Sequence, residues 1–416
     1  MTSVAGQDWF RNPALQRVLA LLNADGGEAR VAGGAVRNSL MGMPAGDVDI
    51  ATTLVPDEVI GRAKAAGIKA VPTGIDHGTV TLVTDRTPFE VTTLRRDLET
   101  DGRRAQVAFG TDWQEDAERR DLTINALYAT ANGEVVDLVG GLADIETRTV
   151  RFIGDADRRI AEDHLRILRF FRFFAFYGSG RPDADGLRAC ARAKGKLAAL
   201  SAERVWSETK KLLSAPDPFR ALLWMRQSGV LTQILPETEK WGIDAIPGLV
   251  AAETAFGWAP DPLLRLAAIV PPDAERLAGL SSRLKLSRAE AACLSEWAAA
   301  PEIPETIGET ALDRMLYRHG PQGLIARLKL ALSAARAKAE TDPPSMARSA
   351  LCHRLLARAE SWQKPDFPIA GGDVIAAGIP AGPKVGQILA TLEAAWVDSN
   401  FNLDRQTLLG RLAALT

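Results

Sequence analysis

Two aspartates separated by one residue, Asp47 and Asp49, limit what this chain can be more than any other feature of its 416 residues. They follow a Gly33-Gly34 pair and a segment with helical character at 35–41. We expect a strand to carry both aspartates, because residues two apart in a strand project to the same face. Two carboxylates on one face repel each other unless a cation lies between them. Mg²⁺ suits such a site, since it binds a few carboxylates together with phosphate oxygens and water.

The glycine pair is a second feature that suits a phosphate-binding site. A Gly-Gly turn lets backbone N–H groups approach a phosphate closely, at the start of a helix whose dipole favours anions. Residues 89–94 are predicted to form a strand in which Glu90 supplies a third carboxylate beside the aspartates. Together these features indicate metal-dependent phosphoryl or nucleotidyl transfer. The alternative is a solvent-facing hairpin with acidic residues and a turn, in which Glu90 is simply solvated.

Composition limits the classes of protein to which this chain can belong. With 46% hydrophobic and 25% charged residues, the chain has the balance of an ordinary globular protein. A net charge of −2 does not indicate a nucleic-acid binder, although local clusters of Lys and Arg decide that affinity. The three cysteines are far apart and lack C-x-x-C spacing, which argues against a zinc site or a disulfide framework. No signal sequence or membrane-length apolar run is evident, so we expect a cytoplasmic protein without a membrane partner.

The expected elements change in character along the chain. Strand signals are confined to the first 150 residues or so, and the rest reads as helix interrupted by proline-containing loops. The segment 95–106 is highly charged and is predicted to be a mobile loop. The other expected elements are helices at 13–22, 56–66, 116–128, 156–177 and 202–213, and strands at 29–32, 68–71, 79–84, 89–94 and 134–139.

Two of the expected helices carry clustered charges. Arg119, Arg120, Asp121 and Asn125 crowd two turns, and Asp121 and Asn125 share a face at i,i+4 spacing. In the 156–177 helix the arginines fall on one half and the phenylalanines on the other, and Asp163 and Arg166 project side by side. Either cluster is also compatible with a solvated helix surface.

Six blocks occur in order: GGAVRNSLMG…DVDIATT, FEVTTLR, TDGRRAQVAF, DAERRDLTINALY, EDHLRILRF and SAERVWSE. This series resembles the class II tRNA nucleotidyltransferases, the CCA-adding enzymes, which share their head with bacterial poly(A) polymerases. The clear motifs span about 31–213. The resemblance implies an α+β fold, a nucleotidyltransferase-type mixed β-sheet head followed by an all-α neck, body and tail. The corresponding spans are a head at 1–150, a neck at 151–235, a body at 236–345 and a tail at 346–416.

The resemblance also implies roles for individual residues. Asp47 and Asp49 match the metal-binding pair, and the strand pattern, not the resemblance, adds Glu90 as a candidate catalytic carboxylate. The residues that match nucleotide-binding positions are Gly33, Gly34 and Arg37 at the triphosphate, Arg119, Arg120, Asp121 and Asn125 at the sugar and phosphates, and Glu162, Asp163 and Arg166 near the base. Arg169, on the charged half of the same expected helix, is a further candidate nucleotide-binding residue. Glu203, Arg204 and Glu208 match a block that supports the base-reading helix. A Gly-rich segment at 378–389 with Lys384 is a candidate RNA contact, or an ordinary helix start.

The implied activity is addition of CCA to the 3′ end of tRNA from CTP and ATP, with Mg²⁺ as cofactor and tRNA as partner. An aspartate that accepts and an arginine that donates can together read cytosine or adenine, because both bases present an amino group and a ring-nitrogen acceptor. The charged segment at 96–104 favours an enzyme able to add the terminal A. Poly(A) polymerisation, CC-only or A-only addition, an inactive RNA-binding relative and a transferase for small molecules or proteins remain alternatives. The sequence does not indicate an oligomeric state.

Overall fold

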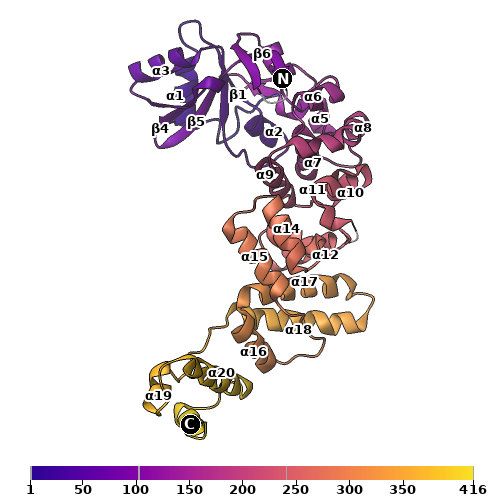
Figure 1. The fold of residues 1–416 in the computed structure, drawn as a ribbon. Coiled ribbons are helices and arrows are strands. Elements are labelled where there is room, and N and C mark those ends of the chain that lie inside the picture. Colours follow the sequence, from indigo (N-terminus) through magenta and orange to yellow (C-terminus); the bar gives the residue numbers. More distant parts are fainter. Residues whose placement is uncertain (1, 102–103, 240, 416) are drawn as a thin grey trace. The chain divides into compact units, whose positions relative to one another are not determined.

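The computed structural model describes residues 2–101, 104–239 and 241–415, with side chains described outside 96–107. The chain separates into two compact units, Met1–Ile234 and Leu235–Thr416. Every described strand belongs to the first unit, and the described elements of the second are helical (Figure 1). A mixed sheet followed by many helices confirms the predicted fold class. The finer division into four domains stays a prediction.

Seven strands of the first unit form one mixed sheet in the order β3-β4-β5-β2-β1-β8-β9. The strands are β1 (Ala29–Ala32), β2 (Asp49–Thr52), β3 (Lys69–Gly74), β4 (Thr79–Thr84), β5 (Thr87–Thr93), β8 (Leu127–Ala129) and β9 (Val135–Asp137). Their pairings are antiparallel except that of β2 with β5, which is parallel. In that pair Asp49 lies opposite Glu90, so the predicted neighbourhood of these two carboxylates is confirmed.

The two aspartates do not share a strand. β2 begins only at Asp49, and Asp47 lies in the bend before it, directly after Gly46 with its positive φ of 71°. The segment Pro44-Ala45-Gly46 turns the chain and delays the start of the strand, because proline and a left-handed glycine do not extend a ladder. The predicted strand geometry is therefore wrong for Asp47.

Three helices flank the sheet: α1 (Pro13–Leu22), α2 (Gly34–Leu40) and α3 (Pro56–Ala65). The Asn12 side chain accepts the N–H of Ala14 at 2.9 Å and so caps α1 as its position before proline predicts. α1 and α3 contact each other and the strands β1, β3 and β4, whereas α2 contacts β1 and β8. The sheet and these helices bury apolar side chains such as Leu15, Val18, Val80 and Leu82.

Residues 95–106 are not a loop. They contain most of a two-stranded sheet made by β6 (Arg95–Asp101) and β7 (Arg104–Phe109), and only 102–103 of the predicted loop lie outside the described residues. A two-stranded ribbon is held by its backbone hydrogen bonds and does not require one apolar face. A charged sequence can therefore form it without the alternation of apolar residues on which strand prediction depends.

The helix predicted at 116–128 is also wrong. Helix α4 (Trp113–Glu118) ends early, and a 3₁₀ turn at Thr123–Asn125 leads into β8. Every residue from 121 to 129 is buried. A segment buried on all sides has no amphipathic period, so its sequence does not distinguish a helix from a turn and a strand.

The predicted 156–177 helix is two helices, α6 (Ala156–Glu162) and α7 (Arg166–Tyr177). The break lies at Asp163, where φ is −152° and ψ is 108°. The Asp163 side chain accepts the N–H of Leu165 at 3.0 Å, a local bond that competes with helical hydrogen bonding. The other helices of this unit are α5 (Gly141–Glu146), α8 (Ala184–Ala193), α9 (Ala202–Leu213), α10 (Phe219–Ser228) and α11 (Val230–Ile234).

The second unit has its own buried side chains, among them a cluster that includes Leu328 and Leu355 and another that includes Trp396 and Leu408. Its helices are α12 (Ala245–Phe256), α13 (Pro262–Ile269), α14 (Ala274–Arg283), α15 (Arg288–Ala299), α16 (Glu309–His319), α17 (Pro321–Lys338), α18 (Pro343–Glu360), α19 (Gly371–Ala376), α20 (Pro383–Asp398) and α21 (Arg405–Ala413).

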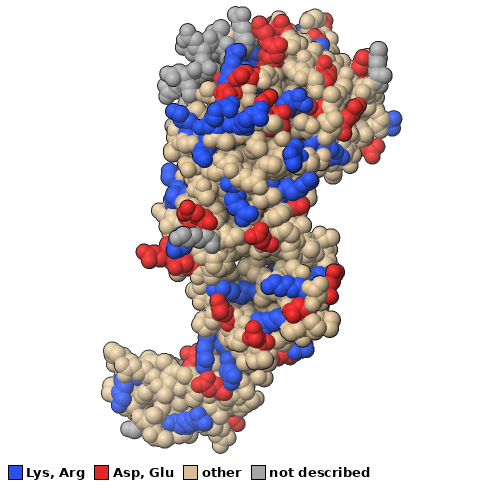
Figure 2. All heavy atoms as spheres, turned by 90° about the vertical axis from the view of Figure 1, so that its right-hand side faces the viewer, with Lys and Arg blue, Asp and Glu red and all other residues tan. Residues whose placement is uncertain are grey.

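Three further findings concern membrane-spanning helices, the cysteines and the surface charge. Within the described ranges, none of the helices has the length and apolar character needed to cross a membrane. Cys190, Cys293 and Cys352 are free thiols. On the face drawn in Figure 2, positive and negative side chains are interspersed among uncharged ones, in keeping with the small net charge.

Candidate active site

A cavity of about 880 Å³ in the first unit brings together most of the residues singled out in the sequence. Nine Lys and Arg residues and six Asp and Glu residues line it, so it is more basic than the chain as a whole. The predicted site residues that line this cavity are Gly33, Gly34, Arg37, Asp47, Asp49, Glu90, Arg119, Arg120, Asp121, Asn125, Asp163, Arg166, Arg169 and Arg204.

The glycine turn stands between β1 and α2, at one wall of the cavity. Gly33 has a φ of 68°, a conformation that favours glycine, and an added Cβ there would lie 3.3 Å from the backbone oxygen of Asn125. An added Cβ at Gly34 would meet only the end of the Arg37 side chain, at 3.8 Å. The turn therefore leaves backbone open to the cavity.

Arg37 is held by the protein on almost every side. Its Nε and Nη2 donate to Asn38 Oδ1 at 3.0 and 2.8 Å, Nη2 also donates to the Tyr177 hydroxyl at 2.7 Å, and Nη1 donates to Asn125 Oδ1. Its guanidinium carbon lies 4.0 Å from the centre of the Tyr177 ring. Burial lowers the pKa of Arg37. With four of its five N–H groups engaged, Arg37 offers a ligand positive charge and one remaining N–H.

The carboxylates form the acidic end of the cavity. The pKa of Asp49 is raised, first because surrounding protein displaces water from it and then because Glu90 and Asp47 repel its negative charge. A cation bound here would relieve that repulsion. Among the described residues, no three His, Cys, Asp or Glu side chains converge on a ready-made metal site. Mg²⁺ does not need such a cage, because it binds through one or two carboxylates and completes its shell with phosphate oxygens and water.

Asp116 organises the two arginines that follow α4. It is 1% exposed and accepts from Arg119 Nε at 2.9 Å, from Arg120 Nε and Nη2 at 3.2 and 3.1 Å, and from the Tyr128 hydroxyl at 2.8 Å. Burial raises the pKa of Asp116, but the charges of Arg120 and Arg119 outweigh this and lower it overall. Asp116 thus fixes both guanidinium groups at the cavity wall.

Asp121 and Asn125 lie together as predicted, although a turn rather than a helix joins them. Asn125 Nδ2 donates to Asp121 Oδ1 at 3.2 Å, and Arg169 Nε donates to Asp121 Oδ2 at 2.6 Å. Burial raises the pKa of Asp121, but Arg169 outweighs this and lowers it. The terminal nitrogens of Arg169 are not engaged by a described residue, which leaves them available to an anion in the cavity.

Asp163 and Arg166 face the cavity but do not pair with each other. Asp163 Oδ2 accepts from Arg204 Nη2 at 2.7 Å. Arg166 Nη1 donates to Glu162 and to the backbone oxygen of Arg159, and its Nη2 donates to the backbone oxygen of Arg119 at 3.2 Å. Asp163 and Arg166 therefore have separate ionic partners, Arg204 and Glu162, and do not form an ion pair with each other. Among the described residues, the Nε–H of Arg166 has no partner.

Four predicted residues do not line the cavity. Glu162 forms an ion pair with the lining residue Arg166 and a second one with Arg159 Nη2 at 3.0 Å. Glu208 on α9 is buried and accepts from Arg172 Nε at 2.6 Å, so it ties α9 to α7. Glu203 is in the first turn of α9. Lys384 is exposed at the start of α20 in the second unit, and its predicted RNA contact stays a prediction.

Several lining residues were not predicted from the sequence: Arg95, Asp116, Arg172 and Lys211. Asp116 was detectable, because an aspartate three and four residues before two arginines is a recognisable helical pattern. Arg172 had been placed on the charged half of its helix without a role. Tyr177, which engages Arg37 from 140 positions away, gives no local signal.

Two family models match the chain. The Poly A polymerase head domain matches residues 29–151, and the "Probable RNA and SrmB- binding site of polymerase A" matches residues 182–241. Among curated proteins, the mouse mitochondrial CCA tRNA nucleotidyltransferase 1 is 33% identical over 95% of this chain and 88% of its own length. The CCA-adding enzyme of Geobacillus thermodenitrificans is 35% identical over 92% of both chains. The chain belongs to the CCA-adding enzyme family.

Solved structures agree with this membership. The crystal structure of the Bacillus stearothermophilus CCA-adding enzyme in complex with CTP has a TM-score of 0.72 and 28% identity, and the match covers 97% of this chain and 96% of that one. The Thermotoga maritima CCA-adding enzyme complexed with tRNA has a TM-score of 0.62 at 20% identity, which shows a shared fold. Nucleotidyltransferases of this family generally use a divalent metal, and the repelling carboxylates of Asp47, Asp49 and Glu90 fit that requirement.

Proposed function

We propose that this protein adds CCA to the 3′ end of tRNA, using CTP and ATP and releasing pyrophosphate, with Mg²⁺ as the metal. The observation that carries the proposal is one cavity that joins three acidic residues, a basic wall and a candidate base reader, in a chain of the CCA-adding family. Relatives solved with CTP, with ATP and with tRNA support the choice of substrates. A cytoplasmic location stays a prediction from the sequence.

In the proposed reaction the 3′-hydroxyl of the RNA attacks the α-phosphorus of the nucleotide. Asp47 and Asp49, with Glu90 beside them, would hold Mg²⁺, which when bound would activate the hydroxyl and stabilise the pyrophosphate leaving group. The Gly33 N–H donates to the backbone oxygen of Leu127 at 2.8 Å, so the Gly34 N–H is the one that this turn offers to the phosphates. Arg169 and the arginines fixed by Asp116 supply positive charge where negative charge develops.

In this proposal, Asp163 and Arg166 select the base of the incoming nucleotide. Arg166 is oriented by Glu162 and by two backbone oxygens, so part of its guanidinium is available in a fixed direction. Asp163 is oriented by Arg204. A base with the wrong donor and acceptor pattern would leave one of these partly buried groups unpaired, at a cost of about 1–3 kcal/mol. That cost favours cytosine and adenine over guanine and uracil.

The test uses purified full-length protein, tRNA transcripts that end before, within or after CC, and CTP or ATP supplied singly and together. We expect CTP to extend the shortest transcript by two residues and ATP to extend only a transcript ending in CC. Asp49→Ala should abolish incorporation, whereas Asp57→Ala, an exposed acid on α3, should not change it. ATP-only incorporation, long A tails or no incorporation would each replace the CCA assignment with one of its alternatives.

A further inference from the structure

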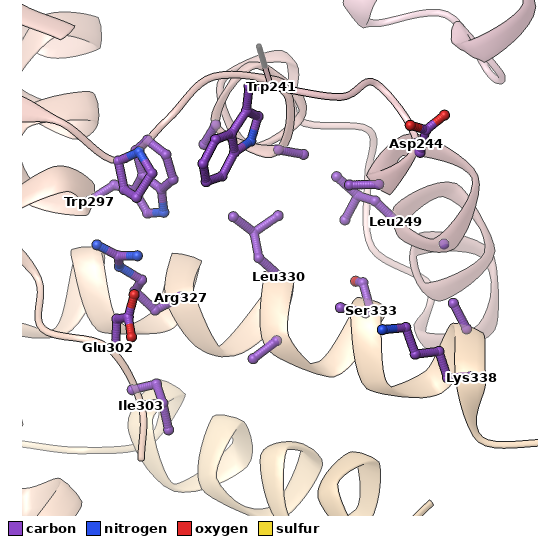
Figure 3. Close-up of a pocket in the computed structure, with 18 residues that line it drawn as sticks. Trp241, Asp244, Leu249, Trp297, Glu302, Ile303, Arg327, Leu330, Ser333 and Lys338 are labelled. Carbon is purple, nitrogen blue, oxygen red and sulfur yellow. The ribbon is translucent and has the colours of Figure 1, made fainter. Parts of the chain in front are cut away.

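The second unit contains a cavity of about 550 Å³. No residue that is assigned to nucleotide transfer lines this cavity. Helices α12, α13, α15 and α17 contribute its walls (Figure 3). The walls are largely apolar, with Leu249, Ala268, Ile303 and Leu330 among the lining residues. Its volume lies within the range of small-molecule sites.

One charged side chain in this wall lacks a partner. Arg327 lines the cavity, and among the described residues none forms an ion pair or a hydrogen bond with its guanidinium. Its Nε is covered by neighbouring atoms, so the terminal nitrogens are the part open to a ligand. Loss of hydration lowers the pKa of Arg327, and the nearby charge of Glu302 offsets this only partly. Glu302 therefore compensates the positive charge of Arg327 only in part, and a bound anion would complete that compensation.

Two indoles border the same region. The guanidinium carbon of Arg327 lies 5.4 Å from the centre of the Trp297 ring. Trp297 is 3% exposed, and its Nε1 also has no hydrogen-bond partner among the described residues. Trp241 is 43% exposed and faces the cavity from the loop above α17 (Figure 3). Indole faces favour a flat, aromatic ligand over a flexible chain.

Two basic residues of α17 lie at separate points along the cavity wall. Arg327 and Lys338 are eleven residues apart, which places them on the same helical face at a separation of roughly 16 Å. Between them the lining residues of α17 are apolar apart from Ser333, whose hydroxyl donates to the backbone oxygen of Lys329 at 2.7 Å. A ligand matched to this surface therefore has an anionic end and an apolar body.

We propose that this cavity binds a small amphipathic carboxylate with a flat aromatic body. The carboxylate accepts from the terminal N–H groups of Arg327, and the ring lies along Leu330 and Ala331 beside the two indoles. Glu302 is the acid nearest the bound carboxylate and weakens its binding by repulsion. This site is independent of the proposed nucleotide transfer.

Calorimetric titration of the full chain with 1-naphthaleneacetate tests the proposal, with the uncharged 1-naphthaleneethanol as the matched probe. We expect saturable binding of the carboxylate and binding of the alcohol weaker by about tenfold or more, the usual effect of a charge-assisted hydrogen bond. Arg327→Gln should weaken carboxylate binding by about the same factor. Glu302→Gln should strengthen it, because a like charge is removed. Arg336→Gln is the control, since Arg336 is also on α17 but lies over Phe256 and does not line the cavity.

Equal binding of the acid and the alcohol, unchanged affinity in Arg327→Gln, or no saturable binding at millimolar concentration would overturn the proposal. Weaker binding in Glu302→Gln would also overturn it, in favour of a neutral heterocycle read by Glu302 and Arg327 together. Circular dichroism checks that each variant is folded. If Arg327→Gln does not fold, the Glu302→Gln variant and the alcohol still decide the question.

Discussion

At the scale of single residues, Asp116 shows how a buried charge shapes the site without facing the chemistry directly. Its carboxylate holds Arg119, Arg120 and Tyr128 at once. Its pKa is lowered, so the ionised form stabilises the fold at any pH above the usual aspartate value of about 3.9. This contribution is lost as pH falls from that value toward the lowered pKa of the folded state.

We therefore expect Asp116→Asn to lower the free energy of unfolding at neutral pH by roughly 2–4 kcal/mol, because it leaves two arginines without their counter-ion. The difference from the wild type should shrink as pH falls below about 4. Urea unfolding monitored by circular dichroism at several pH values measures it. Asp76→Asn, an exposed aspartate, serves as the control. A stability difference that is constant between neutral and acidic pH would contradict the assignment.

Tyr177 is a positioning residue for Arg37 through its hydroxyl and its ring. We expect Tyr177→Phe, which keeps the ring, to raise KM for both nucleotides about fivefold with little change in kcat, since one hydrogen bond of roughly 1 kcal/mol is lost. Tyr177→Leu removes the ring as well and should have the larger effect. Steady-state kinetics with CTP and ATP provide the measurement. A loss of thermal stability with KM unchanged in both variants would show a purely structural role.

The residues that the sequence revealed are those close together in the chain. Asp47, Asp49 and the glycine pair lie within one short segment, and Glu90 followed from strand alternation. Tyr177 and Arg37 meet only through the tertiary fold, and Arg204 reaches Asp163 from α9. Such pairs have no sequence spacing to recognise, so local patterns do not predict them.

At the scale of elements, the sequence located strands and helices well where one face is buried. It failed where a segment is buried on every side, as between 121 and 129, or where a side chain interrupts a helix, as at Asp163. That interruption matters for function, because it places Asp163 before the first turn of α7 and lets it meet Arg204. A continuous helix would have kept it on the side of α6.

Helix α7 is joined to its surroundings by a row of ion pairs, of which Arg172 with Glu208 on α9 is the most enclosed, with side chains 16% and 6% exposed. We expect a double-mutant cycle of Arg172→Gln and Glu208→Gln to give a coupling energy of about 1–3 kcal/mol in unfolding. The exposed pair Arg188 and Asp185, 63% and 81% exposed, should give less than about 0.5 kcal/mol. Equal coupling in both pairs would show that burial does not strengthen the contact between α7 and α9.

At the scale of the whole molecule, the two units have separate buried cores, and the nucleotide cavity belongs entirely to the first. The second contains a buried pair of its own, in which Arg265 Nε and Nη2 donate to both oxygens of Glu253 at 3.1 and 2.6 Å. A nucleotide therefore binds to the first unit, whereas a substitution at Glu253 changes the core of the second. The two units can thus be perturbed separately in the intact chain.

Differential scanning calorimetry of the full chain should show two transitions. ATP at a hundred times its Kd should raise only the transition of the first unit, since it adds about 2.7 kcal/mol to the folded state that binds it. Glu253→Gln removes the carboxylate charge that faces the buried Arg265, so it should lower only the other transition, by roughly 10 °C. Glu275→Gln, an exposed glutamate of the same unit, should move neither. If ATP and Glu253→Gln both shift a single common transition, the chain unfolds as one cooperative body, because only coupling between the two cores would transmit each change to the other.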